Sequence, residues 1–304
     1  MFTFRLFGGA SLEGDSGPLQ GRSVQPRRIA LLALLASDPH HIVSREKLIA
    51  YLWPESEADH GRHRLSESLY VLRKDIGEEA LISEGESVRL KPERFICDVI
   101  SFSEALEKRE TEEAVALYAG PFMDGFFLKN APVFDRWIEA ERWKLAESYR
   151  RALEALATAA DENGDPVRAV EWWSLLASHD PYNSRLALGC MEAMARAGDP
   201  GNAIYMAEEH ARILQKELGA EPTPELRTFA ESLRNGVVHI RLDGGERGKA
   251  PEEDRASDDG QDPAYTLGVE KEPGKALASL PRAPRRRVLV AAAGIMAFLG
   301  VGAW

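Results

Sequence analysis

A row of polar side chains at helical spacing is the part of this sequence that could do chemistry. Within the stretch HRLSESLYVLRKDIG, residues 63–77, the row consists of His63, Glu67, Tyr70 and Lys74. Residues three and four apart share one face of a helix. Their imidazole, carboxylate, phenol and ammonium groups donate or accept hydrogen bonds, as the edges of bases do in the major groove of DNA. We therefore take these four residues as candidates for contacts to bases.

The opposite side of the same stretch is apolar. Leu65, Leu69, Leu72 and Ile76 recur at i, i+4, i+7 and i+11, which is the stripe of a helix that buries one face. Cationic residues flank the polar face, and such flanks suit phosphate contacts, which position a protein on DNA without specifying sequence. The candidate phosphate contacts are Arg62, Arg64 and Arg73 on these flanks, Ser44 and Arg45 at the N-terminal end of the preceding helix, and Arg89 of the expected hairpin. An ordinary amphipathic helix with a solvated charged face explains the same pattern. The surrounding elements must therefore distinguish this interpretation from a DNA-contacting helix.

The elements around this helix have a characteristic order. Residues 2–26 contain short β-prone runs broken by Gly, Ser and Pro, and residues 27–76 have helical periodicity. Ser44 is placed to cap a helix that Pro54 ends, and the next helix is expected from near Ala58 to Gly77. Two β-prone runs then predict a hairpin, Leu81–Ser83 and Val88–Leu90. Strands, three helices and a hairpin predict a winged helix-turn-helix of α+β class over residues 1–98, in which the third helix enters the major groove.

The tip of the expected hairpin is acidic. It reads Glu84-Gly85-Glu86-Ser87, and mainly Arg89 and Lys91 offset these charges. A wing that contacts phosphate usually carries basic residues at its tip, because carboxylates repel phosphate. We therefore expect the wing to contribute little, each monomer to bind weakly, and homodimers to bind repeated half-sites.

The middle of the chain contains a repeat. GDPVRAVEWW begins at Gly164 and GDPGNAIYMA begins at Gly198, 34 residues later, which is the tetratricopeptide period. Ala169 and Ala203 recur in phase and would let paired helices approach closely. Two units are too few for a stable stack, so helices around residues 112–118 and 135–163 must complete it. We predict an all-α, tetratricopeptide-like domain over residues 99–235, in a chain that is mainly α. The predicted core includes Trp137, Trp143, Trp172, Trp173, Leu175 and Leu176.

Several of these stretches resemble a known family. SREKLIAYLWP, HRLSESLYVLRKDIG and CDVISFSEAL resemble the DNA-binding part of transcriptional activators of the Streptomyces antibiotic regulatory protein (SARP) type, whose winged helix is similar to that of OmpR response regulators. ALYAGPFMDGF, WIEAERWKLAESY and LQKELGAEPTPELR resemble the bacterial transcriptional activator domain (BTAD) that follows it. The resemblance covers roughly residues 1–235. It implies a bacterial transcription regulator that activates, binds double-stranded DNA and uses its helical domain to dimerise or contact RNA polymerase.

The C-terminal part lies outside this resemblance. Residues 236–287 are rich in Gly, Pro, Asp and Glu, which predicts a disordered acidic linker. Three arginines, residues 285–287, precede seventeen uncharged residues, 288–304, which as a helix would span about 25 Å. We expect a single transmembrane helix here, although a core helix is the alternative. Because the positive charges precede it, residues 1–287 are expected on the cytoplasmic side of the inner membrane.

Other chemistry finds little support in the sequence. The net charge of −11 argues against a generic nucleic-acid coat protein but allows a local basic face. The spacing of Cys97 and Cys190 fits no zinc motif, so both are expected to be buried thiols, and His60 with His63 lacks further ligands. With neither a nucleophile–base pair nor a glycine-rich cofactor loop, we predict no catalytic residues, cofactor or metal. The alternative function is a membrane-bound tetratricopeptide adaptor that does not bind DNA.

Overall fold

The computed structural model describes residues 1–236 of the chain. The predicted transmembrane helix, residues 288–304, and all but the first residue of the predicted linker lie outside the described residues. Among the helices that are described, none is long and apolar enough to cross a membrane.

A small sheet contains the first strands of the chain and one edge strand that comes much later in the sequence. Its order is β3 (Gly17–Pro18), β2 (Ser11–Gly14), β1 (Phe2–Arg5) and β7 (Phe95–Cys97), with β7 parallel to β1. Asp98 follows β7, and its carboxylate accepts hydrogen bonds of 2.9 Å from the backbone N–H groups of Leu6 and Phe7. Burial raises the pKa of Asp98, while these N–H donors oppose the rise. Asp98 thus fastens the start of the chain to the end of the winged helix.

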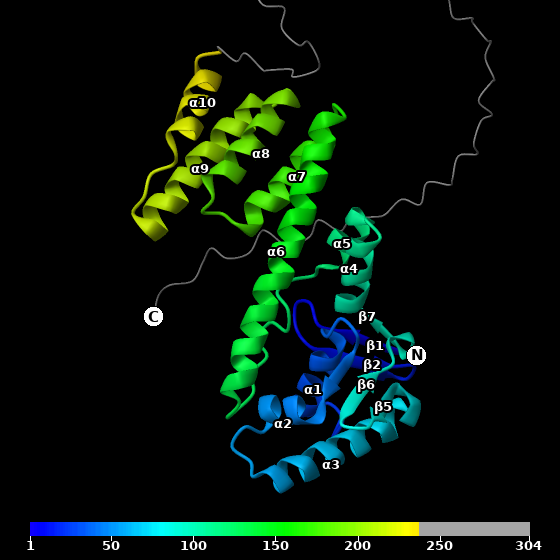
Figure 1. The fold of residues 1–304 in the computed structure, drawn as a ribbon. Coiled ribbons are helices and arrows are strands. Elements are labelled where there is room, and N and C mark those ends of the chain that lie inside the picture. The colour runs from blue at the N-terminus through cyan, green and yellow to red at the C-terminus, as the bar shows by residue number, and fades with distance from the viewer. Residues whose placement is uncertain (237–304) are drawn as a thin grey trace, which may run out of the picture. The chain divides into compact units, whose positions relative to one another are not determined.

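Three helices form the centre of this domain (Figure 1): α1 (Pro26–Ala36), α2 (Arg45–Leu52) and α3 (Ala58–Ile76). The Ser44 hydroxyl caps α2 by accepting from the N–H of Lys47 at 3.2 Å. Gly77 ends α3 with a φ of 93°, a conformation that suits glycine. The predicted helix bounds and the Ser44 cap are confirmed. All four residues of the apolar stripe on α3 are buried, as the spacing predicts.

The predicted hairpin is present and pairs with a third strand. The strands are β5 (Leu81–Glu84), β6 (Ser87–Leu90) and β4 (Ile42–Ser44), in the order β4-β6-β5. Gly85 and Glu86 form the two-residue connection, with Gly85 at a φ of 55°. Short 3-10 turns flank the hairpin at Glu78–Ala80 and Pro92–Arg94. Because β4 leads directly into α2, the hairpin is fixed to the start of that helix.

The rest of the described chain is helical. The elements are α4 (Asp98–Glu107), α5 (Thr111–Leu117), α6 (Pro132–Glu162), α7 (Pro166–His179), α8 (Ser184–Arg196), α9 (Pro200–Leu218) and α10 (Pro224–Arg234). The long helix α6 contacts α2 of the winged helix and also α7 (Figure 1). One buried core accordingly runs from α1–α3 into α4 and the first half of α6.

The repeated Gly-Asp-Pro motif starts two of these helices. Gly164 and Gly198 have positive φ, as glycines that end a preceding helix do. Asp165 then caps α7 by accepting from the N–H of Arg168, and Asp199 caps α9 by accepting from the N–H of Asn202. The proline that follows each Asp occupies the first helical turn, where its missing N–H costs nothing. The 34-residue spacing therefore marks two helical pairs, α7–α8 and α9–α10.

Two predictions about the core of these helices are wrong. Trp143 is 71% exposed and Leu175 is 40% exposed, because each lies on the solvent side of its helix. The other predicted core residues fit: Trp172, Trp173 and Leu176 are buried. Trp137 packs against Phe122, Phe134 and Tyr51 at centroid distances between 5.2 and 6.4 Å.

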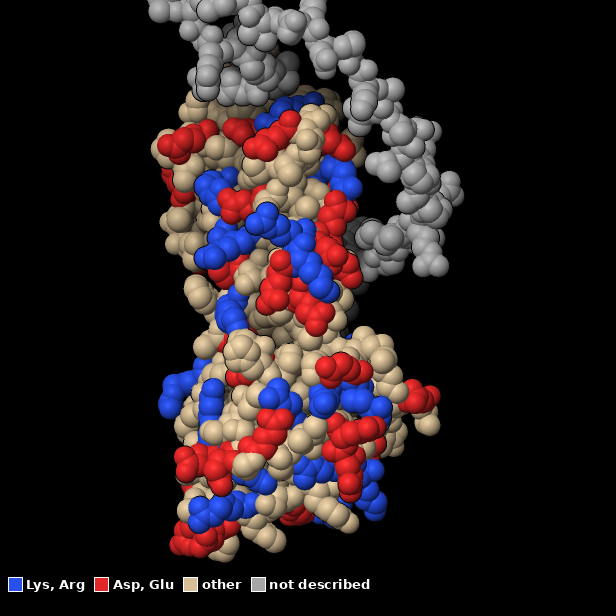
Figure 2. Space-filling model, turned by 45° about the vertical axis from the view of Figure 1, so that its right-hand side comes forward, with Lys and Arg blue, Asp and Glu red and all other residues tan. Residues whose placement is uncertain are grey.

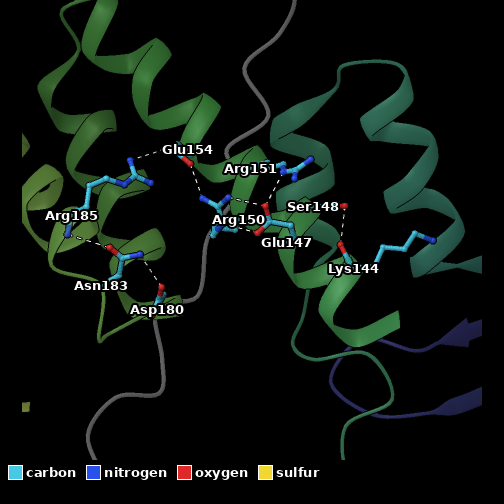
Figure 3. Close-up of polar contacts among 9 residues, drawn as sticks. All are labelled: Lys144, Glu147, Ser148, Arg150, Arg151, Glu154, Asp180, Asn183 and Arg185. Atoms are coloured by element: carbon cyan, nitrogen blue, oxygen red, sulfur yellow. Dashed lines mark hydrogen bonds and ion pairs between the residues drawn. The ribbon is translucent and has the colours of Figure 1, made fainter. Parts of the chain in front are cut away.

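A network of ion pairs runs along the exposed side of α6 (Figure 3). Glu147 accepts hydrogen bonds from Arg150 and Arg151. Glu154 accepts from Arg150 and from Arg185 of α8, each at 2.8 Å. Hydrogen bonds from the two arginines lower the pKa of Glu147 to about 2. The network therefore couples α6 to α8 across the surface of the helical domain.

Candidate nucleic-acid interface

Helix α3 presents a polar face opposite its buried stripe. Tyr70 is 69% exposed, and His63 and Lys74 are exposed on the same side. Among the described residues, these three side chains have no hydrogen-bond or ion-pair partner in the structure. The structure therefore brings three of the four predicted base contacts together on an accessible helical face.

The fourth candidate, Glu67, already has partners. Its carboxylate accepts a 2.5 Å hydrogen bond from Arg22, and the buried Arg28 guanidinium lies 3.6 Å away. Burial lowers the pKa of Arg28, and the charge of Glu67 opposes that effect. Arg28 also donates to the carbonyl of Arg22 and to the side chain of Gln25. Glu67 thus fastens α3 to the segment that precedes α1.

Sequence reasoning missed Arg22 and Arg28 as neighbours of the candidate interface. Arg22 stands 45 residues before Glu67, and only the tertiary fold brings the two together. The feature of the sequence that could have revealed them is the cluster of arginines in RSVQPRR, residues 22–28, around the start of the first helix. Because the Arg22 side chain is largely exposed, it adds a cation at the edge of the polar face.

Two of the residues predicted to contact phosphate form hydrogen bonds with the hairpin instead. The Arg73 guanidinium donates to the carbonyl of Leu81 at 2.8 Å and to the Ser83 hydroxyl at 2.9 Å. Arg89 donates two hydrogen bonds, of 2.6 and 3.0 Å, to the carboxylate of Glu84. This pairing lowers the pKa of Glu84 and raises that of Arg89. Both arginines therefore support the wing in the structure.

The remaining phosphate candidates lie at the starts of α2 and α3. Arg62 pairs with Asp59 at 2.5 Å, and Arg64 donates to the Ser56 hydroxyl at 3.3 Å. The backbone N–H of Arg45, at the start of α2, donates to the carbonyl of Glu86 at the hairpin tip. An anion at this helix start would therefore meet the acidic tip of the wing.

One face of the molecule carries charges of both signs. On the face drawn in Figure 2, lysines and arginines are interspersed with aspartates and glutamates. Interspersed charges produce only a weak long-range field. On that face, local contacts are therefore a better basis for binding than a continuous basic surface.

The described residues contain no group of three or more His, Cys, Asp or Glu side chains that could hold a metal ion. Cys97 and Cys190 are buried, as predicted. Burial raises the pKa of the Cys97 thiol to about 12, which leaves it protonated and unreactive at neutral pH.

Comparisons with known proteins agree with this architecture. The family model of the bacterial transcriptional activator domain matches residues 102–234. The regulatory protein AfsR of Streptomyces griseus is 24% identical over 220 residues, which are 69% of this chain and 22% of AfsR. The structure of Mycobacterium tuberculosis EmbR in complex with a low-affinity phosphopeptide superposes with a TM-score of 0.54 and 23% identity. That match covers 77% of this chain and 65% of EmbR.

The chain thus combines a winged helix with a region, residues 102–234, that matches the bacterial transcriptional activator domain. The predicted resemblance to regulators of the SARP type is confirmed by the domain match over residues 102–234 and by the similarity to AfsR. The chain spans about a fifth of the length of AfsR.

Proposed function

We propose that this chain is a sequence-specific, DNA-binding transcription activator that places α3 in the major groove. The observation that carries this proposal is the exposed, unpaired row of His63, Tyr70 and Lys74 opposite the buried stripe of α3. A reading helix needs this combination, because one face must fix it to the protein while the other offers hydrogen bonds to bases.

The roles of individual residues follow from their partners. His63, Tyr70 and Lys74 contact base edges directly. Glu67 accepts from a cytosine amino group only if it exchanges the hydrogen bond from Arg22 for one from DNA. Arg62 and Arg64 are the phosphate contacts of α3. Their partners near the start of the helix, Asp59 and the Ser56 hydroxyl, hold the two arginines only weakly. Arg73 and Arg89 contact phosphate only if they exchange their hydrogen bonds with the wing for bonds to DNA. Ser44 and Arg45 contact phosphate only where it approaches beside the acidic tip.

The acidic wing limits affinity, so we propose that homodimers bind repeated half-sites. The helical domain then provides dimer contacts or a contact to RNA polymerase. Residues 288–304 tether the chain to the inner face of the membrane, and residues 236–287 give a reach on the order of 40 Å as a random coil. DNA must then come to the membrane surface.

The first experiment is a selection of fragments of the source genome bound by the full chain, followed by fluorescence anisotropy on an enriched site at several salt concentrations. We expect enrichment of a repeated half-site and an affinity that falls steeply with salt. Arg62→Ala should weaken binding to all sequences and reduce the salt slope by about one. Tyr70→Ala should change the preferred sequence instead.

The matched control is Arg227→Ala, which removes an exposed, paired arginine from α10. It should leave both affinity and sequence preference unchanged. If the chain shows neither salt-dependent binding nor enrichment, the regulator proposal fails. The adaptor would then be the better explanation, with its acidic wing tip as the supporting observation.

A further inference from the structure

An apolar groove lies in the helical domain, far along the chain from α3. Helices α7 and α9 form its walls, and α8 contributes to its floor. It encloses about 600 Å³, which is within the usual range for a binding pocket. Two apolar side chains stand exposed along it, Val167 on α7 at 73% and Tyr205 on α9 at 66%.

The groove surface suits an apolar side chain from another molecule. Met194 and Met206 line it with flexible thioethers that adapt to different shapes. Ala177 and Ala187 keep the space between the walls open because their side chains are small. Such a surface exposes apolar area to water unless a partner covers it.

The buried His210 adds no charge to this surface. Its Nε2 forms a 2.9 Å hydrogen bond with the Ser184 hydroxyl. Burial lowers the pKa of His210, so the ring is neutral at neutral pH. The histidine therefore acts as a structural part of the groove.

The charges of the groove are all negative. Asp180, Asp199 and Glu209 line it, and among the described residues that do so there is no lysine or arginine. Asp180 accepts a 3.0 Å hydrogen bond from the neutral amide of Asn183 (Figure 3). Asp199 likewise accepts from Asn202, so neither aspartate has an ion-pair partner among the described residues. Only Glu209 has a cationic partner, Arg212.

We propose that this groove binds a short segment of a partner protein that carries apolar side chains flanked by lysine or arginine. The apolar part fills the space between Val167 and Tyr205, and the cations meet Asp180 and Asp199. The chain's own residues 285–290 have similar chemistry, but we expect the apolar part of that segment in the membrane, so we propose another protein as the occupant of the groove. The inference rests on the protein-contact role of the helical domain in the proposed function.

The test uses three fluorescent peptides with the same leucine-and-alanine centre, flanked by lysine, serine or glutamate. Fluorescence anisotropy measures the binding of each peptide to the full chain. We expect saturable binding in the order lysine, serine, glutamate. Binding of DNA by the same preparation is measured in parallel, so that loss of the peptide site and failure of DNA binding are seen separately.

Three variants locate the site, one of them a double substitution. Asp180→Asn with Asp199→Asn removes two charges but keeps the hydrogen-bond acceptors and the cap of α9. It should reduce the preference for lysine over serine about fivefold. Tyr205→Ala should weaken binding of the lysine peptide at least about tenfold. Trp143→Ala, which removes an aromatic of similar exposure outside the groove, is the matched control and should change nothing.

Four outcomes of the peptide assays would overturn the proposal. These are the absence of saturable binding, equal binding of all three peptides, equal effects of Tyr205→Ala and Trp143→Ala, and stronger peptide binding by residues 1–236 than by the full chain. The last result would show that the chain's own tail occupies the groove. A concentration-dependent dimer that Tyr205→Ala abolishes would assign the groove to a second copy and would also overturn it.

Discussion

Helices α2 and α3 approach each other closely at Gly61, and this contact leads to a testable prediction. A Cβ atom at this position would lie 2.6 Å from Cγ2 of Ile49 on α2. Gly61→Ala should gain about 1 kcal/mol from helix propensity and lose about 1–3 kcal/mol from overpacking. The net expectation is a loss of about 1 kcal/mol in the free energy of unfolding. DNA affinity should fall as well, because the crossing of the two helices sets the position of the reading face.

The decisive measurement is a double-mutant cycle with Ile49→Ala, followed by chemical denaturation of each variant. Ile49→Ala removes the clashing Cγ2 atom and alone should cost about 1–3 kcal/mol, since Ile49 is only partly buried. The double variant should be more stable than the sum of the single effects by about 1–3 kcal/mol. Gly201→Ala is the matched control: its new Cβ meets nothing closer than 3.8 Å, and it should stabilise α9. Additive effects in the cycle would refute the proposed clash.

Three further predictions concern the helical domain. Asp165→Ala should lower the free energy of unfolding by about 1 kcal/mol in denaturation, whereas Asp165→Asn, which can still cap α7, should leave it nearly unchanged. Gly189→Ala should lower the free energy of unfolding by about 1–3 kcal/mol in the same assay, because its Cβ would lie 2.7 Å from the ring of Trp173. A hydrogen bond to Asp161 holds this ring in place. A variant as stable as the wild type would contradict the packing. Because its pKa falls from 4.5 to about 2 on folding, Glu147 contributes stability above pH 4.5 that is lost as the pH falls towards 2. Acid titration should therefore show a shallower loss of stability in Glu147→Gln, and an unchanged profile would contradict this.

Much of the winged helix could be predicted because its signals are local. The leucine stripe, the Ser44 cap and the terminal Gly77 predict α2 and α3 to within a residue or two, since caps and periodicity act over one or two turns. The hairpin follows in the same way from two β-prone runs around Gly85. The pairing of β4 with β6 was not predicted, because a three-residue strand carries too little pattern to show its partner.

The candidate interface was predicted in part. The periodicity of α3 placed His63, Tyr70 and Lys74 on one accessible face, which the structure confirms. It could not show that Glu67 is paired, because its partner lies 45 residues away in the sequence. The exposure of Trp143 was missed for a related reason: composition identifies a large aromatic but not the side of the helix that lacks a neighbour.

By itself, the sequence determined the elements of this protein, through helix caps, hydrophobic periods and the repeated Gly-Asp-Pro motif. These signals depend on contacts between residues a few positions apart, which the order of residue types fixes directly. Tertiary structure alone decided the pairing of Glu67 with Arg22, the approach of Gly61 to Ile49 and the groove between α7 and α9. Each depends on where separate elements meet, and that is settled by the packing of whole helices.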